Sequence, residues 1–465
     1  MVGASDVSWM RRLATLALVL ACLAVPLLVI FSRVLFQDHQ VAFRDAGHFY
    51  YPLVERVQQE WDAGRIPLWA PEASAGMPLL GNPTAAVFYP GKLVFFWLPY
   101  PWAMRVFLVG HVALAFLTMG ALLRGWRIST TGSVLGALSY VFGVPVLSQT
   151  NNMIFLVGAA WAPLGFLAAD RWVRGRSPWA LAGLVVVLAL QVLGGDPEAA
   201  YMTFVCAAGY ALGTAAARPP SVVGRWLRVG GAALIVVILG SLGLSWWSAH
   251  VMHLHFSEAS RDSLPWSPPK TALVSGAWCV VAALVVWRVR RQGNDRGLLV
   301  TLGGLFVAAA IALAITGAQL LPVLEYSRKT FRAAESGGYN DYYGYSLHPL
   351  QMVEVIWPGA LGTLEGGYRT WLNALPPKPQ SRLWMPSVFM GGLTLILAMT
   401  SLSFRSGPPW RVWMSVLEIL SLLASFGYFG SPLSSRNPSV PSWHRRACGP
   451  HRLGISKAST FPFER

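Results

Sequence analysis

The sequence predicts an all-α polytopic membrane protein, a bundle of about eleven transmembrane helices. Of its 465 residues, 54% are hydrophobic and only 12% are charged, whereas soluble proteins carry about 25% charged residues. Apolar runs of about 20 residues recur along the chain, and this length crosses a bilayer core of about 30 Å. A soluble globular domain is therefore excluded.

The individual spans are predicted from these apolar runs. The first extends from Leu13 to about Phe36 and follows Arg11-Arg12, which indicates an uncleaved anchor with a cytoplasmic N-terminus. The other spans are expected near 104–123, 131–149, 153–169, 178–195, 197–216, 229–249, 271–287, 298–322, 384–402 and 411–429. We expect the protein in the cell membrane, the inner or plasma membrane of a bacterium.

The net charge of +16 does not indicate nucleic-acid binding, because the cations are clustered at the ends of apolar runs. Arg171, Arg174 and Arg176 form one such cluster in a predicted cytoplasmic turn. This placement follows the positive-inside rule. Membrane lipids are therefore expected partners, and no nucleic acid is.

The first outer loop is expected over residues 37–90, and a loop of this length is uncommon without a function. It contains an apolar pattern at helical spacing with polar residues on the opposite face, which predicts an amphipathic interfacial helix. The apolar positions are Phe49, Leu53, Val54, Val57 and Trp61, and the polar positions are Glu55, Arg56, Gln58, Gln59 and Glu60.

Just before this helix, the loop combines a cation, an anion and a histidine at Arg44, Asp45 and His48. Beside Tyr51 and its aromatic neighbours, this group suits a site for an anionic ligand at a membrane surface. The alternative is a solvated loop in which Asp45 only caps the helix that follows.

Two further outer connections carry charge. Asp196 and Glu198 lie in a turn between two predicted spans, where ionisable groups often mark a functional site. They could equally cap the next helix, with Pro197 at its first position. The outer loop over 325–383 places Arg328 and Arg332 where they could bind a phosphate; contact with lipid headgroups is the competing interpretation.

Taken together, the chain resembles the YfhO-like family of bacterial membrane proteins, which belongs to the GT-C type of glycosyltransferases. The resemblance covers roughly residues 33 to 430. It is carried by Asp45 with Tyr51-Pro52, Gly64-Arg65-Ile66-Pro67-Leu68-Trp69, Gly76-Met77-Pro78-Leu79, Gly81-Asn82-Pro83, Gly195-Asp196-Pro197, Gln319-Leu320-Leu321-Pro322 with Ser327-Arg328, and Ser346-Leu347-His348-Pro349.

The resemblance implies a GT-C-like transmembrane domain over residues 1–430 that transfers a sugar from a polyprenyl-phosphate carrier. The acceptor would be a glycan or lipid of the cell envelope. Asp45 matches the catalytic aspartate of the first outer loop and would be the general base. The expected substrate contacts are Arg44, His48, Tyr51, Asn82, Asp196, Glu198, Arg328 and Arg332. Asp196 is also the candidate ligand for a divalent cation.

Two other functions fit the same residues. A transporter or flippase of lipid-linked sugars would use a basic outer site for binding without chemistry. A non-catalytic assembly protein would need neither substrate binding nor chemistry at this site. The segment 431–465 departs from the family pattern, because it is a polar, basic tail that an odd number of spans would place outside. We interpret it as a truncated or frame-shifted end.

Overall fold

The fold is known from a computed structural model. It describes residues 4–41, 45–73, 76–216, 295–327, 347–361, 387–402 and 407–426. Regular structure in these ranges is almost entirely helical. Strands β1 (Trp69–Ala70) and β2 (Met77–Pro78) pair antiparallel and are two residues long each. The prediction of an all-α membrane protein is confirmed at this level, and the tail over 431–465 lies outside the described residues.

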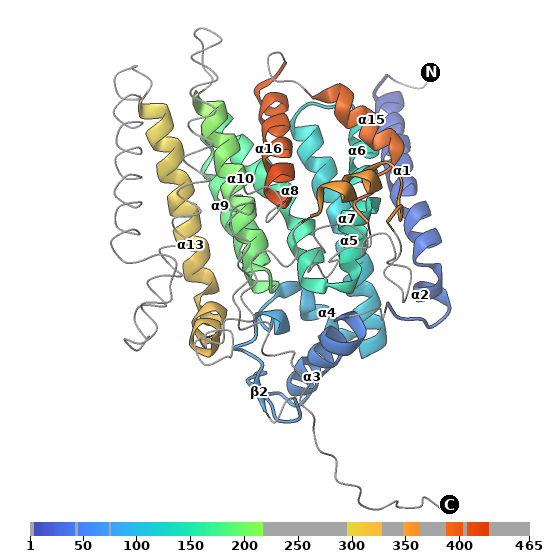
Figure 1. Cartoon of the computed structure of the whole chain (residues 1–465), viewed down its shortest axis with the longest axis vertical. Coiled ribbons are helices and arrows are strands. Elements are labelled where there is room, and N and C mark those ends of the chain that lie inside the picture. Colours follow the sequence, from blue (N-terminus) through green and yellow to red (C-terminus); the bar gives the residue numbers. More distant parts are fainter. Residues whose placement is uncertain are drawn as a thin grey trace, which may run out of the picture.

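The helices are labelled along the chain in Figure 1. Up to the end of the long loop they are α1 (Ala4–Ile30), α2 (Ser32–Phe36), the π-helix η1 (Ala46–Tyr50), α3 (Tyr51–Asp62), η2 (Pro83–Ala85), η3 (Pro90–Leu93) and α4 (Val94–Trp97). The bundle continues with α5 (Tyr100–Gly125), α6 (Thr130–Phe142), α7 (Val144–Leu147), η4 (Ser148–Asn151), α8 (Met153–Gly175), α9 (Pro178–Leu193), α10 (Pro197–Ala216), α13 (Asp295–Ser327), η6 (Pro349–Val355), α15 (Gly392–Ser401) and α16 (Pro409–Ser425).

Four of the described helices are long and apolar enough to cross a membrane, namely α1, α5, α8 and α13. A fifth results if α6 and the bent segment formed by α7 and η4 count as one span. Helices α9, α10, α15 and α16 occupy further predicted spans without passing the same test of length and hydropathy. The predicted spans near 229–249 and 271–287 lie outside the described residues. The total of about eleven spans therefore stays a prediction.

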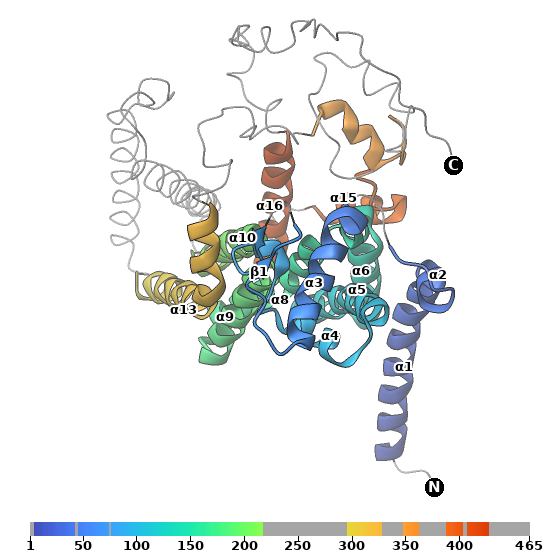
Figure 2. The same cartoon turned by 90° about the horizontal axis from the view of Figure 1, so that it is seen from below.

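Helix α8 is the centre of the bundle and packs against α5, α9 and α10, as Figure 2 shows from below. Small residues on α8 allow close approach. A Cβ added at Gly165 would lie 2.5 Å from Cγ2 of Thr203 on α10. Within a lipid bilayer, such close packing replaces the hydrophobic effect as the force that holds helices together.

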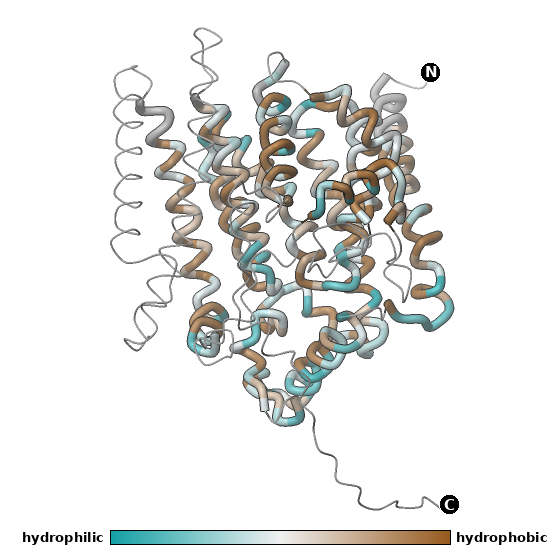
Figure 3. The backbone as a smooth tube through the Cα atoms, in the orientation of Figure 1, coloured by the Kyte–Doolittle hydropathy of each residue, from teal (hydrophilic) through white to brown (hydrophobic). Residues whose placement is uncertain are grey.

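The described residues between 37 and 99 form a layer over one end of the bundle, which we call the loop end (Figure 1). Figure 3 shows that the long helices are mostly hydrophobic, whereas this layer mixes hydrophilic and hydrophobic segments. The layer contains η1, α3, α4 and the β-hairpin. It corresponds to the predicted first outer loop, and the side of the membrane on which it lies stays a prediction.

The predicted amphipathic helix of the loop is confirmed as α3, which buries Leu53, Val54 and Val57. Its polar face is not simply solvated, because Gln58 and Glu60 are buried as well. The prediction was wrong for these two residues. Other parts of the loop cover them: the Gln58 side-chain amide donates a hydrogen bond to the Phe95 carbonyl on α4, at 2.8 Å.

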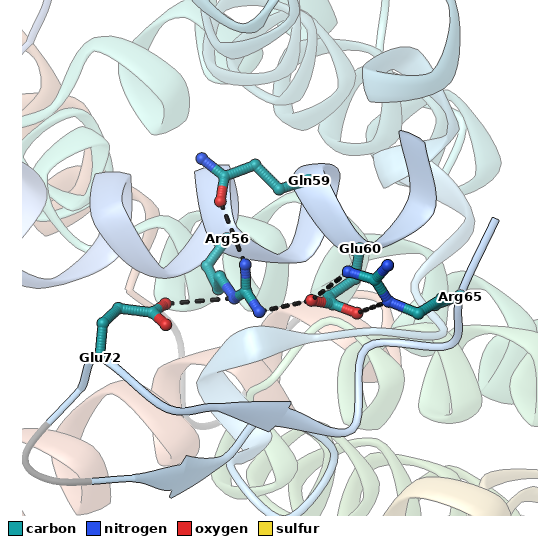
Figure 4. A network of polar contacts seen from close by, with 5 residues as sticks. All are labelled: Arg56, Gln59, Glu60, Arg65 and Glu72. Atoms are coloured by element: carbon teal, nitrogen blue, oxygen red, sulfur yellow. Dashed lines mark hydrogen bonds and ion pairs between the residues drawn. The ribbon is translucent and has the colours of Figure 1, made fainter. Parts of the chain in front are cut away.

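Glu60 is the centre of an ion-pair network that joins α3 to the hairpin segment (Figure 4). Its carboxylate oxygens accept from Arg56 at 2.5 Å and from Arg65 at 2.8 Å, and Arg56 Nε lies 3.1 Å from a carboxylate oxygen of Glu72. The hydrogen bond from Arg65 is the largest cause that lowers the pKa of Glu60. The network holds the chain where it leaves α3 for the hairpin.

The other end of the bundle has its own polar cluster, about three turns farther along α8 than Gly158. Asp170 of α8 accepts hydrogen bonds from Arg174 Nε, at 2.7 Å, and from the Tyr210 hydroxyl of α10. Arg176, which follows α8, donates from Nη1 to the hydroxyl of Thr301 on α13, at 2.6 Å. Asp170 thus joins α8 to α10 through Tyr210, and Arg176 joins the end of α8 to α13.

Candidate functional site

The residues predicted for the site come from loops far apart in sequence, and several of these loops meet at the loop end. Gly195, between α9 and α10, has a φ of +95°, and a Cβ added there would lie 2.7 Å from the carbonyl oxygen of Pro83. A Cβ added at Gly81 would lie 2.9 Å from Cβ of Tyr326, near the C-terminus of α13. Both glycines are needed because backbone and side chain approach too closely for a larger residue.

Asp45 directly precedes η1 with an α-helical backbone, φ −64° and ψ −25°, and its side chain is exposed. The side chain makes no hydrogen bond that caps the helix. The capping role in the alternative interpretation is therefore wrong, whereas the exposure of Asp45 agrees with its solvated loop. Its carboxylate remains accessible to a ligand that approaches the loop end.

Asp196 is buried, with 3% of its surface exposed, at the turn between α9 and α10. Its Oδ1 accepts a hydrogen bond of 2.8 Å from the backbone N–H of Ala199, so it caps α10 as the alternative interpretation predicted. Oδ2 faces α8, where a Cβ added at Gly158 would lie 2.5 Å from it. Burial raises the pKa of Asp196 from 3.8 to about 6; the bond from Ala199 opposes the rise and the charge of Glu198 adds to it.

Tyr50 connects the two aspartates. Its side chain is buried at the end of η1, and burial is the main cause that raises the pKa of its hydroxyl. The negative charges of Asp45 and of Asp196 raise it further. Both carboxylates thus lie within electrostatic range of one phenol, although about 150 residues separate them in sequence. The local pattern predicts Tyr51 and not Tyr50 as a contact, because it does not show which of the two adjacent tyrosines faces inward.

Tyr51 and Asn82 have structural partners instead. The Tyr51 hydroxyl donates to the Val41 carbonyl at 2.5 Å and holds the chain before η1. Asn82 precedes η2, and its Oδ1 accepts from the backbone N–H of Thr84 at 3.1 Å and from the Thr84 hydroxyl at 2.5 Å. These contacts position the loop, and a role in binding substrate stays a prediction for both residues.

The remaining predicted contacts divide into exposed residues and residues outside the described ranges. His48, on η1, and Glu198, in the first turn of α10, are both exposed. Arg44, Arg328 and Arg332 lie outside the described residues. Asp45 and Asp196 therefore share an electrostatic influence on Tyr50, whereas the predicted phosphate-binding cations stay a prediction.

Lys92 is a buried cation that the sequence analysis did not select. It lies on η3 with 2% of its surface exposed, and its ammonium group donates a hydrogen bond to the Ala85 carbonyl. Burial lowers the pKa of Lys92 from 10.5 to about 7. No sequence signal could identify Lys92 as buried, because an irregular loop has no periodicity that separates its exposed residues from its buried ones.

A polar chain beside Lys92 ties the loop to the bundle. The Nδ1–H of His111, on α5, donates to the Phe107 carbonyl at 2.7 Å, so Nε2 must accept, and it lies 2.6 Å from the Tyr89 hydroxyl. Tyr89 therefore donates to His111 and accepts from the indole N–H of Trp161 on α8, at 2.9 Å. Each polar atom in this chain is satisfied, which favours a structural role.

A divalent cation at Asp196 finds little support among the described residues, which contain no group of three or more His, Cys, Asp or Glu side chains placed to hold a metal. Asp196 has one oxygen bound to a backbone N–H, and Glu198 is exposed.

Comparison with known proteins adds no relative: no protein-family model, no curated protein and no solved structure matches the chain significantly.

Proposed function

We propose that the protein is a membrane glycosyltransferase that moves a sugar from a polyprenyl-phosphate carrier to a hydroxyl group of a cell-envelope acceptor. One observation supports this proposal more than any other. Asp45 and Asp196 are predicted from separate motifs, and the negative charges of both raise the pKa of the Tyr50 hydroxyl at the loop end. A pair of carboxylates with different environments is typical of a site where protons are transferred.

In the proposed reaction, the acceptor oxygen attacks the anomeric carbon and its proton passes to Asp45, the general base. The bond between the anomeric carbon and the phosphate oxygen breaks, and its electron pair leaves with the polyprenyl phosphate. Asp45 suits the base because it is exposed and free of a capping bond. Asp196 is buried and would hold the site together, and Arg328 and Arg332 would stabilise the departing phosphate.

The experiment that tests this function is transfer from a radiolabelled polyprenyl-phosphate sugar by the purified full-length protein, with Asp45→Asn as the variant. Removing a general base typically lowers the rate about 10² to 10⁴-fold. The fold should be unaffected, because the Asp45 side chain caps no helix. Asp62→Asn is the matched control, since Asp62 is also an exposed aspartate of this loop. Transfer by Asp45→Asn at the wild-type rate would remove Asp45 from the mechanism.

The second candidate is a transporter or flippase of lipid-linked sugars, and one observation favours it. The span formed by α6, α7 and η4 is bent by 49°, and broken helices are typical of transporter binding sites. A fluorescent lipid-linked sugar that crosses the bilayer of protein-containing vesicles, without transfer to an acceptor, would support transport. If Asp45→Asn leaves that movement unchanged, the loop carboxylate serves neither function.

A further inference from the structure

The bent span ends in five consecutive polar residues, Ser148 to Asn152. Helix α6 has 13 residues, about 20 Å of helix, which falls short of a bilayer core of about 30 Å. The span is completed by α7 and η4 after the 49° bend. Polar side chains therefore lie at the end of a broken span, where the apolar surroundings provide few partners.

Four side-chain oxygens of this segment are buried and have no hydrogen-bond partner among the described residues. They are Ser148 Oγ, Gln149 Oε1, Asn151 Oδ1 and Asn152 Oδ1. Asn152 is 8% exposed and directly precedes α8, yet it does not cap that helix. Thr150, in the same segment, is satisfied, because its hydroxyl donates to the Leu147 carbonyl at 2.9 Å. Buried polar atoms without partners are rare in folded proteins and need an explanation.

The segment adjoins the corner of the bundle that holds Asp196. The first two turns of α8 follow it directly, and there a Cβ added at Gly194 would lie 2.5 Å from Cγ1 of Val157. Ile154 similarly faces Gly195, at 2.7 Å from its added Cβ. The unpartnered oxygens thus lie at the start of the helix that forms one wall of the candidate site.

The chemistry of these atoms indicates what they would bind. The Gln149 amide nitrogen donates to the Pro145 carbonyl at 3.0 Å, which identifies the unpartnered atom as its oxygen, an acceptor. A ligand that reaches these oxygens must therefore offer hydrogen-bond donors. No carboxylate belongs to the segment, whereas divalent cations are normally held by carboxylates. A group rich in hydroxyls satisfies this set best.

We propose that Ser148, Gln149, Asn151 and Asn152 bind the hydroxyl groups of the sugar on the lipid-linked substrate. The identity of the substrate rests on the proposed function, but the binding of a sugar does not depend on Asp45 or on transfer. Each unpartnered amide oxygen would accept a hydrogen bond from a sugar hydroxyl. A site built in this way rejects a lipid phosphate that lacks the sugar, because its polar atoms would then stay unpaired.

The test measures binding to the full-length protein in lipid nanodiscs. The probes are undecaprenyl phosphates that carry glucose, galactose, mannose, N-acetylglucosamine or arabinose, each compared with undecaprenyl phosphate alone. We expect at least one sugar to tighten binding by about tenfold or more, the effect of one or two good hydrogen bonds. If every sugar-bearing lipid binds no tighter than the bare phosphate, the proposal is overturned.

Asn152→Leu and Asn151→Leu are the diagnostic variants, because leucine has a similar size and lacks the amide. Both should abolish the preference for sugar, and Asn152→Leu should unfold at no lower temperature than the wild type, since an unpaired buried oxygen is removed. Thr150→Val is the matched control: it removes a satisfied hydroxyl, so it should lower the unfolding temperature and keep the preference. A preference that survives in both leucine variants would contradict the proposal.

Two further arms separate this inference from its alternatives. If replacing Na⁺ by K⁺, Mg²⁺ or choline changes stability in the wild type but not in Asn152→Leu, the segment is a cation site and the sugar proposal is wrong. If Asp45→Asn still prefers the sugar-bearing lipid and the wild type transfers nothing, the sugar site stands and the proposed transfer fails.

Discussion

Asp170 and Asp196 lie at opposite ends of the bundle and are both buried, with 2% and 3% of their surfaces exposed. Their hydrogen-bond partners differ. Asp170 has a cation, Arg174, and a hydroxyl, Tyr210, as hydrogen-bond partners. Asp196 has one backbone N–H and, among the described residues, no cation. Asp45 and Glu198 add negative charge near Tyr50 and Asp196 at the loop end.

The difference separates a structural carboxylate from one that is available for function. A buried charge is tolerated when it is paired and hydrogen-bonded. Asp170 meets this condition and joins α8 to α10. Asp196 caps α10 through one backbone N–H but lacks a cation among the described residues, so the comparison marks it as a buried carboxylate with an incompletely compensated charge, and a role in the proposed site stays a prediction.

The largest effect is expected from Asp170→Ala. The substitution leaves the buried Tyr210 hydroxyl without an acceptor and Arg174 without its ion pair, and we expect a loss of about 2 to 3 kcal/mol in unfolding free energy. Thermal or denaturant unfolding in detergent measures this change. An unchanged stability would show that the cluster is not what holds this end together.

Asp196→Asn should change stability in the opposite direction at pH 8. The amide still caps α10 at Ala199 and removes a buried charge, and a pKa raised from 3.8 to about 6 corresponds to roughly 3 kcal/mol at most. Between pH 3.8 and about 6, Asp196 keeps its proton in the folded wild type and has lost it in the unfolded chain. Wild-type stability should therefore fall as pH rises from about 4 to about 6, and the asparagine variant should lack that part of the pH dependence.

The two tyrosines extend the comparison. Tyr210→Phe removes a hydrogen bond to Asp170 and should cost about 1 kcal/mol of stability. The Tyr50 hydroxyl makes no side-chain hydrogen bond among the described residues, so Tyr50→Phe should cost less stability than Tyr210→Phe. Transfer should be slower, because the hydroxyl belongs to the proposed site. Unfolding and transfer assays on both variants measure the two effects. Equal stability losses in the two variants would contradict the proposed difference between a structural cluster around Asp170 and a functional site at the loop end.

The smallest effect is expected from Asp38→Asn. Asp38 pairs with Arg105 of α5; the Arg105 side chain is buried, but the Asp38 side chain is 90% exposed. Asparagine keeps a side-chain oxygen that can accept from the guanidinium, and water screens the carboxylate that is lost, so we expect a change of about 0 to 1 kcal/mol. The Arg105 guanidinium lies 4.7 Å from the Trp102 ring centroid and keeps that contact in the variant. A fall in unfolding temperature as large as that of Asp170→Ala would mean that pairing at the loop end is as important as at the other end.

The sequence predicted some parts of the candidate site and failed on others for identifiable reasons. Asp45 and Asp196 were found because each lies in a short motif beside an apolar span. Tyr50 was missed in favour of Tyr51, since two adjacent residues on a helix differ only in the direction of their side chains. The burial of Gln58 and Glu60 was also missed, because periodicity shows one face of a helix and not what covers the other.

The sequence by itself determined that the chain is a helical membrane protein and where most of its described helices lie, since apolar run length and helix-capping residues are local properties. The tertiary structure decided which charges are paired. Tyr210 meets Asp170 only when α10 packs against α8, and the charges of Asp45 and Asp196 reach one phenol only when the first loop folds against the turn between α9 and α10. Such pairing depends on packing between distant segments, which no local pattern records.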